Sequence, residues 1–104
     1  MKRDLIYPEG SWVALITPFC KNGELDIDGF KSLVDFQASN GTSGLLLMGS
    51  TGEPTSLFQE EKKTIIEEMA PYCHGKIHAF FGVTCGSTSQ TIELAQFAQE
   101  KGAD

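Results

Sequence analysis

The segment LLLMGSTGEPTS, residues 45–56, places polar groups directly behind a run of large apolar residues. The run stops at Gly49, and the adjacent hydroxyls of Ser50 and Thr51 precede Gly52. Such hydroxyls can bind a carboxylate or phosphate oxygen, and so can the backbone amides that glycine leaves accessible. The segment therefore predicts an anion-binding loop; a strand-to-helix connection that needs glycines for geometry alone is the structural alternative.

The acidic residue that follows this loop, Glu53, has two interpretations. Its carboxylate could act as a general base, or it could bond to backbone amides and brace the loop. Carboxylates that brace a loop are commoner than catalytic ones, so the bracing role is the main expectation.

Two glycine-containing loops fail the patterns of nucleotide-binding sites. Residues 44–50 lack the lysine that precedes Ser or Thr in a Walker A loop, and neither this loop nor FGVTCGS at residues 81–87 matches GxGxxG. A nucleotide is therefore not expected, and no other cofactor is indicated.

The cysteines and histidines do not have the spacing of a zinc site. The group considered is Cys73, His74, His78 and Cys85. Cys20 has no neighbouring histidine in the sequence, so a nucleophilic role for it has no support. No metal is expected; small buried cysteines and surface histidines account for these residues.

The composition indicates one globular domain. The chain has 104 residues, of which 40% are hydrophobic and 21% charged. The eight Lys and Arg are scattered and the net charge is -6, which argues against nucleic-acid and membrane-surface binding. No apolar run approaches the ~18 residues of a membrane span, and residues 1–10 lack the apolar core of a signal peptide. Three well-separated cysteines fit a reduced, cytoplasmic compartment.

Three apolar segments alternate with three helical patterns. The expected strands are WVALI at 12–16, residues 44–48, and HAFFGV at 78–83. The first expected helix runs from a cap at Asp26 or Asp28 to Asn40-Gly41. The second begins after Phe58 and runs to about Ala70, where Pro71 ends it. The third runs from a cap at Ser87 or Thr88 to Lys101-Gly102, and Ala103 and Asp104 are expected to extend beyond it without contacts. Strands apolar throughout predict an α/β fold with a parallel sheet covered on both faces.

An open sheet of three parallel strands would leave both of its edges bare. The chain also stops where a fourth strand should begin. We therefore expect residues 1–104 to be the front part of something larger, and the isolated chain to self-associate or to fold poorly.

Several segments, in this order and spacing, together resemble the dihydrodipicolinate synthase and N-acetylneuraminate lyase family. They are VALITPF, GTSGLLLMGSTGEPTSL, EEK, GVTCGST and a final KGAD, and they span residues 10–104. The family fold is a TIM (β/α)8 barrel, usually in tetramers. The resemblance implies that residues 1–104 are the N-terminal part of a single barrel domain, truncated after the third helix and holding the first three to four β-α units, and that a homo-oligomer forms.

The family's chemistry implies a role for each residue of the loop. Its members condense or cleave pyruvate-type substrates through a Schiff base on a lysine, without a metal or other cofactor. By position, Thr51 would bind the carboxylate of the keto acid through its amide and hydroxyl. Ser50 would bind alongside it and join a tyrosine proton relay. Gly49 and Gly52 would complete the substrate-binding loop, and Glu53 would support it.

The resemblance leaves the substrate open between two enzyme classes. A synthase of lysine biosynthesis, which condenses pyruvate with an aldehyde, aspartate semialdehyde, is the main expectation. N-acetylneuraminate lyase or another 2-keto-3-deoxy sugar-acid aldolase is the alternative. A non-catalytic barrel fragment that binds a small carboxylate or a complementary chain is the alternative from another class.

The family's principal catalytic side chains have no counterpart in these residues. The resemblance puts the Schiff-base lysine on strand six, a catalytic tyrosine on strand five and a relay tyrosine after strand four, all beyond Asp104. Residues 1–104 alone are therefore not expected to catalyse the reaction. Lysine inhibition of the enterobacterial kind is not expected either, because the positions that bind lysine in inhibited members hold Gln59, Lys62, Gly86 and Gln90.

Overall fold

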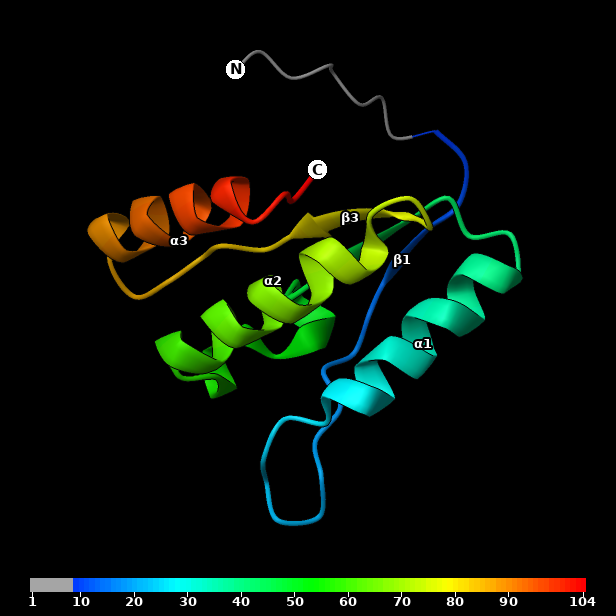
Figure 1. Cartoon of the computed structure of the whole chain (residues 1–104). Coiled ribbons are helices and arrows are strands. Elements are labelled where there is room, and N and C mark those ends of the chain that lie inside the picture. The colour runs from blue at the N-terminus through cyan, green and yellow to red at the C-terminus, as the bar shows by residue number, and fades with distance from the viewer. Residues whose placement is uncertain (1–8) are drawn as a thin grey trace.

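The computed structural model describes residues 9–104; residues 1–8, including most of the segment judged not to be a signal peptide, lie outside the described residues. Strands β1 (Trp12–Ala14), β2 (Gly44–Leu47) and β3 (His78–Phe81) form one parallel sheet in the order β1-β2-β3. The helices are α1 (Ile27–Ser39), α2 (Gln59–Cys73) and α3 (Thr88–Glu100). The short 3-10 turns η1 (Ser50–Gly52) and η2 (Pro54–Ser56) connect β2 to α2. Figure 1 shows α2 between α1 and α3.

The expected alternation of strands and helices is confirmed, although all three strands are shorter than expected, β2 by one residue and β1 and β3 by two. In the register, Gly44 of the central strand lies opposite Trp12 on one side and His78 on the other. Single backbone bonds continue the ladders beyond the strands, from Leu15 N to Leu46 O at 2.9 Å and from Gly82 N to Leu47 O at 2.8 Å. The carboxyl ends of all three strands therefore meet at one edge of the sheet.

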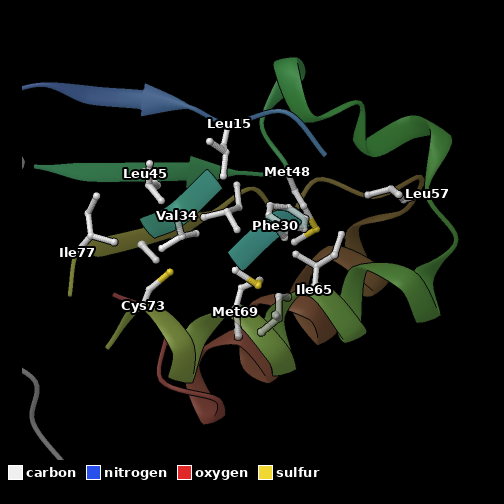
Figure 2. Close-up of a cluster of buried hydrophobic side chains, with 14 of the residues drawn as sticks. Leu15, Phe30, Val34, Leu45, Met48, Leu57, Ile65, Met69, Cys73 and Ile77 are labelled. Carbon is white, nitrogen blue, oxygen red and sulfur yellow. The ribbon is translucent and has the colours of Figure 1, made fainter. Parts of the chain in front are cut away.

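The helices cover one face of the sheet only, so the expectation of two covered faces is wrong for these residues. In β2, Leu45 and Leu47 are 0% exposed whereas Leu46, which points to the other face, is 37% exposed. Figure 2 shows the core between the sheet and the helices, with Leu45 on the sheet side and Met69 on α2. Successive side chains of a strand point to opposite faces of the sheet. An apolar run therefore does not show whether both faces are buried against other elements.

Polar side chains cap the helices and decide between the expected caps. Asp26 Oδ1 accepts a hydrogen bond from Gly29 N at 2.8 Å, and Ser87 Oγ accepts one from Gln90 N at 3.2 Å. At the start of α2, Glu61 Oε1 accepts a hydrogen bond from Phe58 N at 2.9 Å. Each bond satisfies one of the amides that a helix leaves unpaired at its amino end.

Pro71 does not end α2, contrary to the expectation, because the helix continues to Cys73. Pro71 lies in the last turn, where its missing N–H removes a single helical bond, and Cys73 beyond it is buried with Met69 in the core. Burial of these side chains offsets the lost bond, so packing overrides the local preference.

The last residue does not hang free as expected. Asp104 N donates to Ala79 O at 3.1 Å, and Asp104 Oδ2 accepts a hydrogen bond from Ala79 N at 3.0 Å. Asp104 thus lies along the edge of β3, where the backbone groups of Ala79 would otherwise be unpaired.

A polar cluster joins α1 to α2 outside the core. Tyr72 Oη donates to Asp35 Oδ2 at 2.7 Å, and Lys76 Nζ donates to Asp35 Oδ1 at 3.2 Å. The Lys76 ammonium also lies 3.7 Å from the centroid of the Tyr72 ring. The Tyr72 hydrogen bond, followed by the bond and charge of Lys76, lowers the pKa of Asp35 below its ordinary value.

We predict that this cluster stabilises the chain less as the pH falls. A carboxylate whose pKa is lowered by folding contributes stability above its unfolded pKa, and this contribution is lost as the pH falls through its folded pKa. Asp35→Asn should therefore flatten the acid side of the curve of unfolding free energy against pH, measured by chemical denaturation. Glu24→Gln, on an exposed loop, is the control, and an equal flattening in both variants would contradict the prediction.

The carboxyl ends of β2 and β3 approach so closely that one position requires glycine. A Cβ added at Gly82 would clash with the carbonyl oxygen of Met48 and lie 2.9 Å from its carbonyl carbon. Both neighbours are backbone atoms, which cannot rotate away as a side chain would.

Gly82→Ala should therefore destabilise the chain by about 1–3 kcal/mol, the usual cost of overpacking. The matched control is Gly86→Ala, whose added Cβ meets nothing nearer than Gln90 Oε1 at 3.9 Å. The free energy of unfolding from urea denaturation measures both variants. Equal stability of the two would show that the ends of the strands can separate at no cost.

Candidate functional site

The loop that follows β2 begins and ends at residues with left-handed backbone conformations. Met48 has φ 57° and Glu53 has φ 55°, the only positive φ values of non-glycine residues within 9–104. Between them, Gly52 N donates to Gly49 O at 2.8 Å and Glu53 N donates to Ser50 O at 3.1 Å, which closes the turn η1. Such strained conformations cost about 1–3 kcal/mol each and cluster at functional sites. The loop is thus held in a shape that the chain would not adopt locally.

The turn leaves four hydrogen-bond donors without acceptors. Ser50 and Thr51 are exposed, and within residues 9–104 neither their hydroxyls nor their amides make a hydrogen bond. These donors follow one another at the carboxyl end of a central parallel strand, which is the edge where α/β folds bind ligands. The arrangement can bind a small anion through several hydrogen bonds at once.

A buried threonine in the segment that follows β1 holds the loop in place. Thr17 is 6% exposed, and its Oγ1 donates to Gly52 O at 2.7 Å. A Cβ at Gly52 would lie 3.1 Å from Thr17 Oγ1 and 3.3 Å from Leu15 O, so the close approach favours glycine there. Sequence reasoning missed Thr17 as a positioning residue; the signal is a hydroxyl residue that directly follows the apolar run VALI.

The structure places Gly49 and Glu53 at the two ends of the turn. Gly49 precedes η1 in an extended conformation, and a Cβ there would lie 2.8 Å from Leu46 Cδ2. Glu53 is exposed, and its carboxylate bonds to no amide within the described residues. The backbone of Glu53 supports the loop instead, since its carbonyl also accepts a hydrogen bond from Ser56 N at 3.0 Å.

The cysteines and histidines lie apart from this loop. Cys20 is exposed, Cys73 is buried and Cys85 is half-buried, and all three are free thiols. Burial, more than the nearby charge of Asp104, raises the pKa of Cys73 to about 11. Within residues 9–104, no group of at least three His, Cys, Asp or Glu side chains is placed to hold a metal ion.

Comparisons with known proteins agree on one family. The model of the Dihydrodipicolinate synthetase family matches residues 7–104. A 4-hydroxy-tetrahydrodipicolinate synthase from Cereibacter sphaeroides is 45% identical over 95 residues, which cover 91% of this chain and 32% of the relative. The chain thus spans about a third of the length of the curated relatives that it matches.

Solved structures agree with the observed arrangement of strands and helices. The dihydrodipicolinate synthase of Aquifex aeolicus superposes with a TM-score of 0.86 and 39% identity, over 91% of this chain and 32% of that one. A prophage protein of the dihydrodipicolinic acid synthase family from E. coli K12, in complex with pyruvate, superposes with a TM-score of 0.85 and 33% identity, over 90% of this chain and 32% of that one. The three strands with their helices correspond to the amino-terminal β-α units of such TIM barrels. The chain belongs to the dihydrodipicolinate synthetase family.

Proposed function

We propose that residues 49–53 bind the carboxylate of pyruvate, and that this chain contributes the loop to a 4-hydroxy-tetrahydrodipicolinate synthase. Such an enzyme condenses pyruvate with aspartate semialdehyde through a Schiff base on a lysine. The observation that carries the proposal is the set of unpaired donors on Ser50 and Thr51 at the end of β2. The names of the relatives support the synthase, and the pyruvate bound to the related E. coli protein supports the keto acid.

In this proposal, each donor of the turn has a partner on the substrate. Thr51 donates from its amide and its hydroxyl to the carboxylate, and Ser50 donates to it alongside and takes part in proton transfer. Hydrogen bonds to an ionised group are shorter and stronger than neutral ones. A carboxylate held by both residues fixes the direction of the adjacent carbonyl carbon, which is the atom that a lysine attacks.

The same loop would also serve a sugar-acid aldolase, because its substrates share the 2-keto carboxylate. The curated relatives that the chain matches are named 4-hydroxy-tetrahydrodipicolinate synthase, and this favours aspartate semialdehyde as the second substrate. A non-catalytic fragment that binds a carboxylate differs from both enzymes, since it would form no covalent intermediate.

The proposal extends to assembly and compartment. A homotetramer follows from the family resemblance. The exposed side chain of Leu46 lies on the sheet face without helices, which the remaining strands of a barrel would enclose. Three free thiols fit a reduced cytoplasm. Among the described residues, no helix has both the length and the apolar character needed to cross a membrane.

We predict that Thr51→Val weakens pyruvate binding roughly ten- to hundredfold, the effect of one lost hydrogen bond to a charged group. Valine keeps the shape of threonine and removes the hydroxyl donor. Pyruvate titration followed by the backbone amide NMR signals of Ser50 and Thr51 measures the dissociation constant.

The matched control for this variant is Thr55→Val, an exposed threonine in the neighbouring turn η2. It should bind pyruvate as the unsubstituted chain does. Equal affinities in all three proteins, or pyruvate-induced shifts confined to residues distant from the loop, would refute the carboxylate site.

A second prediction separates binding from catalysis. Treatment with pyruvate and borohydride should leave the mass of the 104-residue chain unchanged, because the family resemblance places the lysine that forms the Schiff base beyond Asp104. The same treatment should add a reduced pyruvate group to a protein extended to the length of its relatives. Intact-mass spectrometry distinguishes these results, and an adduct on the 104-residue chain would contradict the assignment of the lysine to a later strand.

A further inference from the structure

Three polar side chains meet beside a pocket that is separate from the carboxylate loop. Gln59 and Lys62 come from the first turns of α2, and Cys85 comes from the segment between β3 and α3. All three line an open pocket of about 450 Å³, so small solutes in solvent can reach the cluster. Neither the loop nor the proposed reaction uses any of them.

Lys62 is buried without a carboxylate partner. Its side chain is 7% exposed, and its Nζ donates to Thr84 O at 3.3 Å and lies 3.9 Å from Cys85 Sγ. Within residues 9–104 it forms no ion pair, whereas the adjacent Lys63 pairs with Glu93 at 2.7 Å. A buried amine is costly unless it is paired, so this contact with sulfur is unusual.

The thiol is fixed in place beside this amine. Cys85 Sγ donates to Gln59 Oε1 at 3.3 Å, and Cys85 N donates to Thr91 Oγ1 at 3.1 Å. The second polar atom of the same amide, Gln59 Nε2, is buried and has no hydrogen-bond partner among the described residues. An oxygen atom added to Cys85 Sγ could accept a hydrogen bond from Gln59 Nε2, which lies close to it and has no other partner among the described residues.

We propose that Cys85 is a peroxide-sensitive thiol that forms a reversible covalent link to Lys62. In the first step, one molecule of hydrogen peroxide oxidises the thiol to sulfenic acid and leaves as water. In the second, the Lys62 amine, after releasing its extra proton to solvent, attacks the sulfur. The sulfur–oxygen bond breaks, the oxygen leaves as water with one amine hydrogen, and a sulfur–nitrogen bond remains. The net change is the loss of two hydrogen atoms from the protein, with peroxide reduced to two molecules of water.

The link would join two elements that noncovalent contacts now hold together. It would tie the start of α2 to the connection between β3 and α3. Pro54, Thr55 and Leu57, which follow the carboxylate loop, line the same pocket. Oxidation would therefore stiffen the wall behind that loop. The chemistry does not depend on the proposed function, because neither pyruvate nor the Schiff-base lysine takes part.

The chain supplies two internal controls for this chemistry. Cys20 is exposed, but its only described sulfur contact is with Leu25 O at 3.9 Å, so no amine is held beside its sulfur as Lys62 is beside Cys85. Cys73 is buried, and its raised pKa, about 11, keeps it in the unreactive thiol form.

The test is peptide mapping by mass spectrometry after the full chain is treated with one equivalent of hydrogen peroxide. The peptides that contain Lys62 and Cys85 should appear joined, lighter than their sum by two hydrogen atoms, and should separate again with dithiothreitol. Treatment in guanidinium should lower the yield of this link at least about tenfold, because unfolding removes the proximity of the two groups. Lys63→Met is the matched control for Lys62→Met, and it should link as the unsubstituted chain does.

The unsubstituted chain alone can refute the proposal, so the test does not depend on how well Lys62→Met folds. Oxidation of Cys85 to sulfinic acid without a link would overturn it, as would equal linkage in the native and denatured chains. Attachment of Cys85 to a residue other than Lys62 would overturn it as well.

Discussion

The hydrogen bond from Thr17 Oγ1 to Gly52 O is the contact on which the shape of the candidate site depends. It joins the segment after β1 to the loop after β2, across a separation of 35 residues. Both groups are buried, so losing either one would leave the other unsatisfied at a cost of about 1–3 kcal/mol. With the carbonyl of Gly52 held toward β1, the donors of Ser50 and Thr51 remain unpaired by the protein. The loop is preorganised for an anion because a neighbouring strand fixes its other side.

The close approach of the strand ends reinforces this arrangement. Gly82 admits the Met48 carbonyl, and Met48 adopts a left-handed conformation although it is buried and carries a large side chain. Packing of the core holds this unfavourable conformation, since Met48 belongs to the cluster between sheet and helices. The buried apolar contacts of Met48 thus maintain the strained backbone at the start of the loop.

The start of α2 connects the carboxylate loop to the rest of the molecule. Its backbone is capped by Glu61, and its buried face carries Lys62 toward the segment after β3. Residues 54–58 directly follow the carboxylate loop, and most of them also line the pocket beside Cys85. A structural change in the carboxylate loop or in the pocket therefore affects the same segment, residues 54–58.

Much of the fold and of the candidate site could be predicted from local sequence signals. The apolar runs indicated the strands, Asp26 and Ser87 were among the expected caps, and the glycines beside Ser50 and Thr51 indicated the loop. These features depend on residues close together in the chain, where backbone sterics and local hydrogen bonds decide the conformation.

Tertiary structure alone decided the features that depend on distant partners. Only the packed chain shows that Thr17 bonds to Gly52 and that Asp104 lies along β3. Burial of Met69 and Cys73 carries α2 past Pro71, against the local preference. The sequence also did not determine how many faces of the sheet are covered. The strands are apolar throughout and their side chains alternate in direction, so both faces are apolar, yet all three helices lie on one face. In each case the deciding energy is burial or hydrogen bonding between residues far apart in sequence, which no local pattern records.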